Sequence, residues 1–155
     1  MDMKKNILIL FAVFIAAASY SQTNSDKIDL KNVKYFYSRL KDSGINTKDE
    51  LAWEYTYGDT SQTKLKVLGE ILEKEGLKTV EIKKAKYDPK KYVLMVSEIK
   101  QYTPEALNDR MHYLNNIART NNIMQSDAAF SAEIPKKEKE ELKNYKPVLE
   151  LKKHK

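Results

Sequence analysis

The architecture of this chain follows from one segment, Lys91-Tyr92-Val93-Leu94-Met95-Val96-Ser97-Glu98-Ile99. It is rich in the β-branched and aromatic residues that suit a strand, and successive side chains on a strand point to opposite faces of the sheet. Apolar residues occupy both sets of alternate positions in this segment. The pattern therefore predicts a central strand that is covered at least partly on both faces.

Three segments carry apolar residues at helical spacing. Each begins with a residue whose side chain can cap an N-terminus, and each is followed by glycine or asparagine, which tolerate the left-handed conformation that ends helices. The second begins with Asp59, whose spacing to Gln62 is typical of a capping box. We expect these helices, with their capping residues, to span Asp29 to Gly44, Asp59 to Gly76 and Thr103 to Asn122.

Three further strands are predicted around the central one. Trp53, Tyr55 and Tyr57 alternate with polar residues, which indicates a half-buried strand whose aromatic stripe faces the core; a partner or ligand surface is the alternative interpretation. The segment 79–87 is rich in lysine, as an edge strand should be, and the turn Asp88-Pro89-Lys90 joins it to the central strand. The last strand is expected over 124–134.

The order of these elements is a helix, then β-α-β-β-α-β, then a charged tail. Because β-α-β crossovers are right-handed, this order predicts an α+β, ferredoxin-like sandwich. Its four-stranded antiparallel sheet has the first and third strands in the middle and both crossover helices on one face. The open face then needs a cover, for which we expect the helix 29–43 or the second copy in a homodimer.

The N-terminal segment has the features of an export signal. Lys4-Lys5 precede an apolar run of twelve residues, and small residues flank a cleavage point near Ser21–Gln22. Twelve residues are too few to span a bilayer, which takes about 20, so no stable membrane insertion is expected. The sequence thus predicts a signal peptide over 1–21, a domain over 22–134, and secretion or a periplasmic location.

Charge and cysteine content narrow the class of partner. The chain has no cysteine, which excludes disulfides and attachment through a lipidated cysteine. Its net charge is +6, but the tail 135–155 holds eight lysines against four glutamates, so the predicted domain is close to neutral. A nucleic-acid partner is therefore not expected, since such proteins carry a basic patch on the folded domain.

No pattern in the sequence indicates catalysis or a bound metal. The chain has two histidines, His112 and His154, no clustered metal ligands and no glycine-rich phosphate loop. Asp109 could orient His112, but no nucleophile is tied to that pair. We assign no catalytic residue and no cofactor or metal; the enzymatic alternative is a cofactor-free hydrolase built around His112 and Asp127.

From Phe36 to Phe130 the chain resembles the RraB-type domain, the regulator of ribonuclease E activity B. The resemblance rests on five features in the same order. They are the helix ending Lys41-Asp42-Ser43-Gly44, the strand Trp53-Glu54-Tyr55-Thr56-Tyr57, the helix ending Leu72-Glu73-Lys74-Glu75-Gly76-Leu77, the hairpin, and the helix ending Ile117-Ala118-Arg119 before a last strand with an aspartate.

The resemblance implies a ferredoxin-like, non-catalytic protein that binds and restrains an RNA-degrading enzyme. The chain departs from the family where Asp127-Ala128-Ala129 replaces the common Asp-Gly-Trp, and it lacks the acidity of the known inhibitors. An exported protein would also not meet a cytoplasmic ribonuclease, so we expect the fold to serve another protein partner. The candidate partner-binding residues are Glu54, Thr56 and Asp127; a periplasmic small-molecule or envelope-polymer binder using the open face is the alternative.

Overall fold

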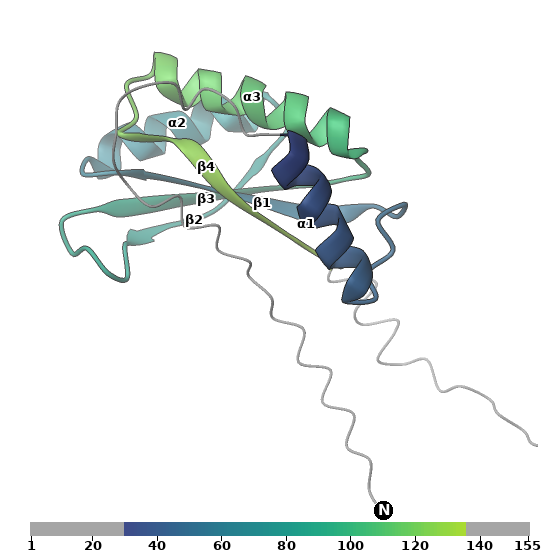
Figure 1. The fold of residues 1–155 in the computed structure, drawn as a ribbon. Coiled ribbons are helices and arrows are strands. Elements are labelled where there is room, and N and C mark those ends of the chain that lie inside the picture. The colour runs from purple at the N-terminus through teal and green to yellow at the C-terminus, as the bar shows by residue number, and fades with distance from the viewer. Residues whose placement is uncertain (1–29, 136–155) are drawn as a thin grey trace, which may run out of the picture.

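The computed structural model describes residues 30–135, which form three helices and four strands (Figure 1). The predicted signal peptide and most of the predicted basic tail lie outside the described residues. Within 30–135, no helix combines the length and apolar character needed to cross a membrane. The elements are α1 (Leu30–Asp42), β1 (Leu51–Asp59), α2 (Gln62–Lys74), β2 (Lys78–Lys84), β3 (Tyr92–Lys100), α3 (Pro104–Thr120) and β4 (Gln125–Glu133).

The four strands form one antiparallel sheet in the order β2-β3-β1-β4. The central positions of β1 and β3 and the edge position of β2 confirm the prediction. Both crossover helices, α2 and α3, lie on the same side of the sheet (Figure 1). The domain therefore has the predicted ferredoxin-like arrangement, with α1 as an additional N-terminal helix.

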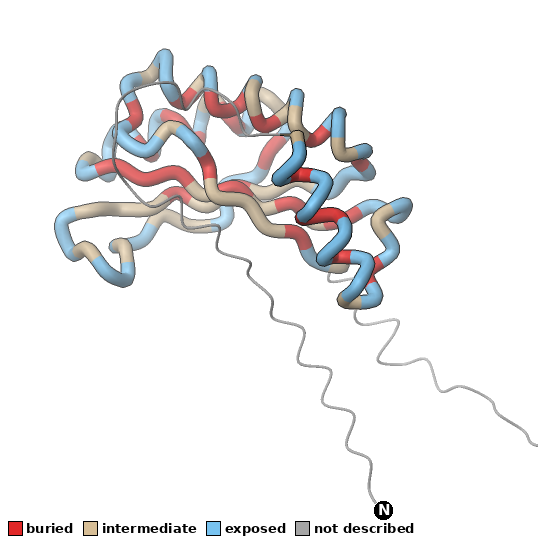
Figure 2. Tube along the Cα trace, in the orientation of Figure 1, coloured by how far each residue is buried: buried red, intermediate tan, exposed pale blue. Residues whose placement is uncertain are grey.

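The core lies between the sheet and this helical layer. Trp53, Tyr55 and Tyr57 are at most 1% exposed, and Leu94 and Val96 face the same side from β3. Buried and partly exposed positions alternate along β1 (Figure 2), as expected for a sheet with one face in the core. The interpretation of the aromatic stripe as core is thus confirmed.

The expectation that the helix 29–43 covers the open face is wrong. Phe36 of α1 packs edge-on against Phe130 with 4.8 Å between ring centroids, and Tyr37 stacks on Trp53 at 5.9 Å. The Tyr37 hydroxyl also donates to the carbonyl oxygen of Tyr102 at 2.7 Å. Because Trp53 and Phe130 point to the helical side, α1 extends the layer of α2 and α3. Helical periodicity predicts which side of this helix is buried, but it does not indicate which face of the sheet the helix packs against.

All three helices end in the same way. After α1, Gly44 adopts a positive φ, and the N–H groups of Gly44 and Ile45 donate back to Lys41 and Leu40. The same pair of bonds follows α2 at Gly76 and α3 at Asn122, and in each case the next residue is a buried Ile or Leu. These are Schellman motifs, and they confirm the helix ends predicted from glycine and asparagine.

The start of α2 differs from the prediction. Ser61 is the N-cap, and its side chain accepts the N–H of Lys64 at 3.3 Å. Asp59 lies two residues earlier, is buried, and accepts the N–H groups of Ser61 and Met124. Asp59 therefore ties the end of β1 to the segment that leads into β4, a contact that no local spacing could reveal.

Candidate functional site

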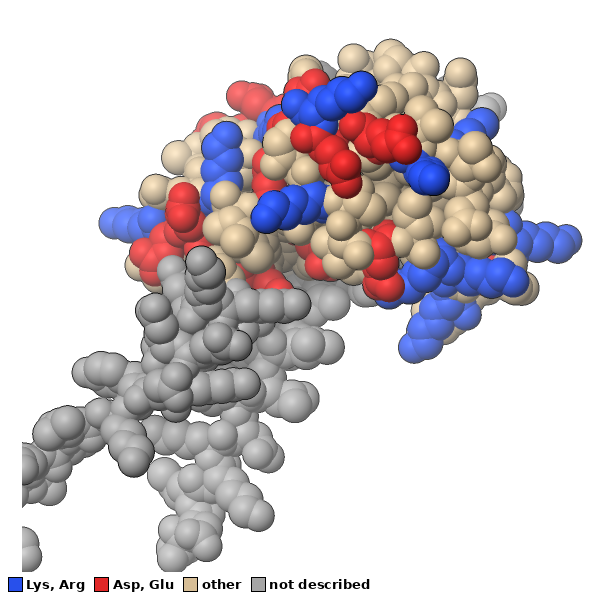
Figure 3. All heavy atoms as spheres, turned by 180° about the vertical axis from the view of Figure 1, so that it is seen from behind, with Lys and Arg blue, Asp and Glu red and all other residues tan. Residues whose placement is uncertain are grey.

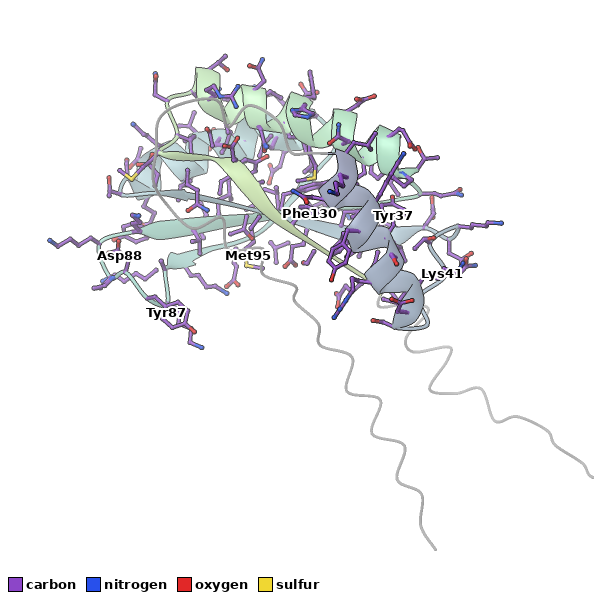
Figure 4. The ribbon with its side chains drawn as sticks, viewed as in Figure 1. Tyr37, Lys41, Tyr87, Asp88, Met95 and Phe130 are labelled. Carbon is purple, nitrogen blue, oxygen red and sulfur yellow. The ribbon has the colours of Figure 1, made fainter. Side chains whose placement is uncertain are left out.

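The face of the sheet opposite the three helices is the candidate site, and we call it the open face. Strand register places Glu54 between Ser97 of β3 and Ser131 of β4, and Thr56 between Met95 and Ala129. Figure 4 shows Met95 pointing away from the helices, whereas Phe130 and Tyr37 lie on the helical side. The open face consists of Ala52, Glu54, Thr56, Val93, Met95, Ser97, Ile99, Ala129, Ser131 and Glu133, with Lys78, Glu81 and Lys83 of β2 along one edge.

The middle of the open face is half-buried although no helix of the described residues covers it. Side chains on neighbouring strands stand about 5 Å apart and shield one another. Towards the end of the sheet the shielding fails, since Ile99 is 59% exposed and Glu133 is also exposed. The open face is therefore a flat surface with an apolar centre, three hydroxyl-bearing residues, three carboxylates and two lysines.

The structure brings two of the three predicted site residues together. Glu54 and Thr56 are neighbours on the open face. Asp127 is not among them, because the β1–β4 pairing is irregular between Thr56 and Gly58. Its Oδ1 lies 3.4 Å from Nη2 of Arg119, which ties β4 to α3 on the helical side. A binding role for these residues stays a prediction.

A buried polar network under α3 was missed by sequence reasoning. Arg110 of α3 donates from Nη2 to Oε2 of Glu98 at 2.9 Å, and from Nε to Oε1 at 3.3 Å. The hydroxyls of Tyr55 and Tyr102 each donate to Oε1 of Glu98 at 2.9 Å. Nη2 of Arg110 also reaches the carbonyl oxygen of Glu75 at the end of α2, at 2.9 Å. The network joins both crossover helices to β1 and β3.

This network is suited to structure and not to proton transfer. Burial, followed by the nearby Glu98 carboxylate, raises the pKa of Tyr55 and of Tyr102 far above the ordinary value of 10.0. Both hydroxyls therefore stay protonated donors at neutral pH. The sequence did contain a signal for the network, because Glu98 has the same strand parity as the core residues Leu94 and Val96.

Residues 30–135 do not bring His112 and Asp127 together as the cofactor-free hydrolase would require. His112 makes no hydrogen bond or ion pair with another described residue, and Asp127 pairs with Arg119 instead. In the same range, no group of three or more acidic, histidine or cysteine side chains could hold a metal ion.

Charge is mixed on the described surface. Acidic and basic side chains are interspersed on the face seen in Figure 3. Seventeen basic and fifteen acidic residues lie between positions 30 and 135. The described domain thus has no strong excess of either sign to select a nucleic acid or a highly charged partner.

Comparison with known proteins gives one result. The family described as "Regulator of ribonuclease activity B" matches residues 34–127, from α1 into β4. Comparisons with curated proteins and with solved structures gave no match. The family match covers well over half of the chain and part or all of every helix and strand of the fold. The chain therefore belongs to the family of regulators of ribonuclease activity B.

Proposed function

We propose that this protein is an exported, non-catalytic regulator that binds another protein on the open face of its sheet. Membership of a family of regulators supports a binding role. The observation that carries the proposal is that β3 is apolar on the face that no described residue covers, at Val93, Met95 and Ile99. Exposed apolar patches of this kind mark interaction surfaces.

The size of the open face indicates how a partner would bind. Two strands of nine residues and three strand spacings give a surface of roughly 30 by 15 Å, or about 450 Å². A stable interface buries about 800 Å² on each partner, so the open face alone supports a transient complex. Tyr87 would extend the interface, since it is 89% exposed and projects from the β2–β3 loop on the side where Met95 lies (Figure 4).

The compartment in which this protein acts limits the proteins that it can meet. We propose that residues 1–21 are removed near Ser21–Gln22 and that the mature chain acts in the periplasm or outside the cell. A protein in that location does not meet a cytoplasmic ribonuclease, so the regulated partner is an envelope or extracellular protein. Mass spectrometry of the protein from fractionated cells tests this directly: a cytosolic product that keeps Met1–Ser21 would contradict it.

Capture from an envelope extract tests the binding face. The immobilised mature chain, residues 22–155, is compared with the variants Glu54→Ala and Thr56→Ala. Glu73→Ala is the matched control, because Glu73 is an exposed carboxylate on α2. We expect both open-face variants to lose the captured protein while the control retains it. Equal capture by all four proteins, or equal loss in the control, would refute the proposed face.

A further inference from the structure

We propose that the hairpin formed by β2 and β3 holds this protein against the surface of an anionic lipid bilayer. The loop of the hairpin, residues 85–91, carries lysines and an exposed tyrosine that the fold itself does not require. Tyr87 and Lys83 border on the open face, but the centre of that face, around Met95, stays free for a protein partner. The proposal therefore adds a second binding surface to the proposed function.

The lysines of the hairpin extend beyond the strand whose edge they protect. Strand β2 ends at Lys84, and lysine along an edge strand prevents pairing with other chains. This accounts for Lys83 and Lys84. Lys86, Lys90 and Lys91 lie in the loop, outside the strand. Edge protection therefore does not account for the basic loop.

Several of these lysines are not neutralised within the described part of the chain. Both acidic side chains of the hairpin are paired already, Glu81 with Lys83 and Asp88 with Lys91, the latter at 3.7 Å. The exposed hairpin lysines that form no ion pair within residues 30–135 are Lys84, Lys86 and Lys90. The hairpin thus presents an excess of three positive charges.

This charge is concentrated at one corner of a domain that is nearly neutral as a whole. Tyr87 and Asp88 lie at the lower left of the fold in Figure 4, and in the reversed view of Figure 3 basic side chains gather at the lower right. Salt limits the reach of exposed charges to about 10 Å. A bilayer therefore responds to the lysines that lie next to it and not to the net charge of the domain.

Tyr87 supplies an apolar contact beside these charges. It is 89% exposed, and Nζ of Lys86 lies 5.2 Å from the centroid of its ring. The turn that presents Tyr87 is held by two backbone bonds, from Ala85 N–H to the Lys91 carbonyl at 2.9 Å and from Lys91 N–H to the Asp88 carbonyl at 3.0 Å. Tyrosine is enriched at the headgroup level of membranes, because its ring is apolar and its hydroxyl polar.

The shape of the hairpin favours a bilayer over a nucleic acid. Single strands bind in basic grooves, where successive bases stack on aromatic side chains. Here one ring stands on a projecting loop, and the other exposed tyrosines, Tyr35 and Tyr113, belong to α1 and α3. A flat anionic surface needs no groove, and a projecting loop with lysines around a tyrosine meets it directly.

Co-sedimentation with lipid vesicles tests the proposal. The mature chain, residues 22–155, is mixed with vesicles of phosphatidylglycerol and phosphatidylcholine in equal parts, or of phosphatidylcholine alone. We expect binding to the anionic vesicles only, and weaker binding as salt is added. Removing one lysine near an anionic surface weakens binding about fivefold, so removing three should lower the partition coefficient about 100-fold. The three changes are Lys84→Gln, Lys86→Gln and Lys90→Gln.

A matched variant removes the same charge elsewhere. It replaces exposed lysines outside the hairpin, with the changes Lys41→Gln, Lys48→Gln and Lys74→Gln. We expect it to bind the anionic vesicles far better than the hairpin variant does. The lysines of residues 136–155 are present in every variant, so their attraction to the vesicles is common to all.

Fluorescence reports the contact at the loop itself. Trp53, the single tryptophan of the chain, is buried and gives a constant background. In Tyr87→Trp, anionic vesicles should shift the emission to shorter wavelength and protect it from acrylamide. Tyr35→Trp, at a position 60% exposed on α1, is the control and should show neither effect.

Several outcomes overturn the proposal. They are no binding to the anionic vesicles, equal binding to both lipid compositions, equal loss in the two lysine variants, and equal fluorescence changes at Tyr87→Trp and Tyr35→Trp. Tighter binding of a single-stranded oligonucleotide through the same hairpin lysines would also overturn it. No protein partner enters these measurements, so their failure leaves the capture experiment with Glu54→Ala and Thr56→Ala standing.

Discussion

Replacing Glu98 by glutamine should destabilise this protein more than any comparable change on its surface. The side chain of Glu98 is 7% exposed and that of Arg110 is 17% exposed. Breaking a buried ion pair by removing one partner costs about 3–5 kcal/mol, because the other charge stays buried and uncompensated. Arg110 keeps the carbonyl oxygen of Glu75 as an acceptor, so we expect the lower end, about 3 kcal/mol.

Urea unfolding at neutral pH measures this effect, with Asp127→Asn as the matched control. The pair of Asp127 and Arg119 is nearly half exposed on both sides, and such pairs contribute about 0–1 kcal/mol. The double variant Glu98→Gln with Arg110→Gln should recover part of the loss, because no unpaired charge remains. A loss below about 1 kcal/mol for Glu98→Gln, or one equal to that of the control, would refute the assignment of Glu98 as the centre of the network.

Three further variants test contacts that hold the elements in place. Burial opposes ionisation of Asp59, but the N–H groups of Ser61 and Met124 favour it, and the net effect is a lowered pKa. The Asp59 carboxylate therefore stabilises the fold above about pH 4, and this stabilisation is lost as the pH falls through the lowered pKa. Asp59→Asn should therefore cost more stability at pH 7 than at pH 3 in urea unfolding; an equal cost at both would contradict this. Phe130→Ala should cost about 3 kcal/mol and speed hydrogen exchange throughout α1, and unchanged exchange would show that the ring contact with Phe36 does not hold this helix. Gly76→Ala should cost about 1 kcal/mol of stability, measured by thermal unfolding. The cost comes from the positive φ alone, because the added Cβ meets nothing within 4 Å. Gly76→Asn should cost less, since asparagine tolerates a positive φ better than alanine does.

The features predicted correctly are those that depend on neighbours in the sequence. Alternation in β1, the proline and threonine that open α3, and the residues that end the helices are local signals, and each lies where expected. Strand order followed from them, because the handedness of β-α-β crossovers leaves few arrangements.

The features that sequence reasoning missed depend on residues far apart in the chain. Asp59 is held by Met124, 65 positions away, and Glu98 receives the hydroxyl of Tyr55 from another strand. The position of α1 is set by its packing beside α3 at one end of the helical layer, which no local sequence pattern indicates. Binary patterning shows that a side chain is buried but does not identify the group that it contacts.

Strand β3 carries apolar side chains on both faces of the sheet, and only one of these faces belongs to the core. The core explains Leu94 and Val96, but Val93 and Met95 are only partly buried and Ile99 is 59% exposed. Burying such a side chain fully is worth about 1.5–3 kcal/mol, so completing the burial of three that are partly shielded gives a few kcal/mol. That amount corresponds to a dissociation constant near 1 mM, which fits a transient complex. A partner that also contacts Tyr87, which is 89% exposed, would bind more tightly than these three side chains alone allow.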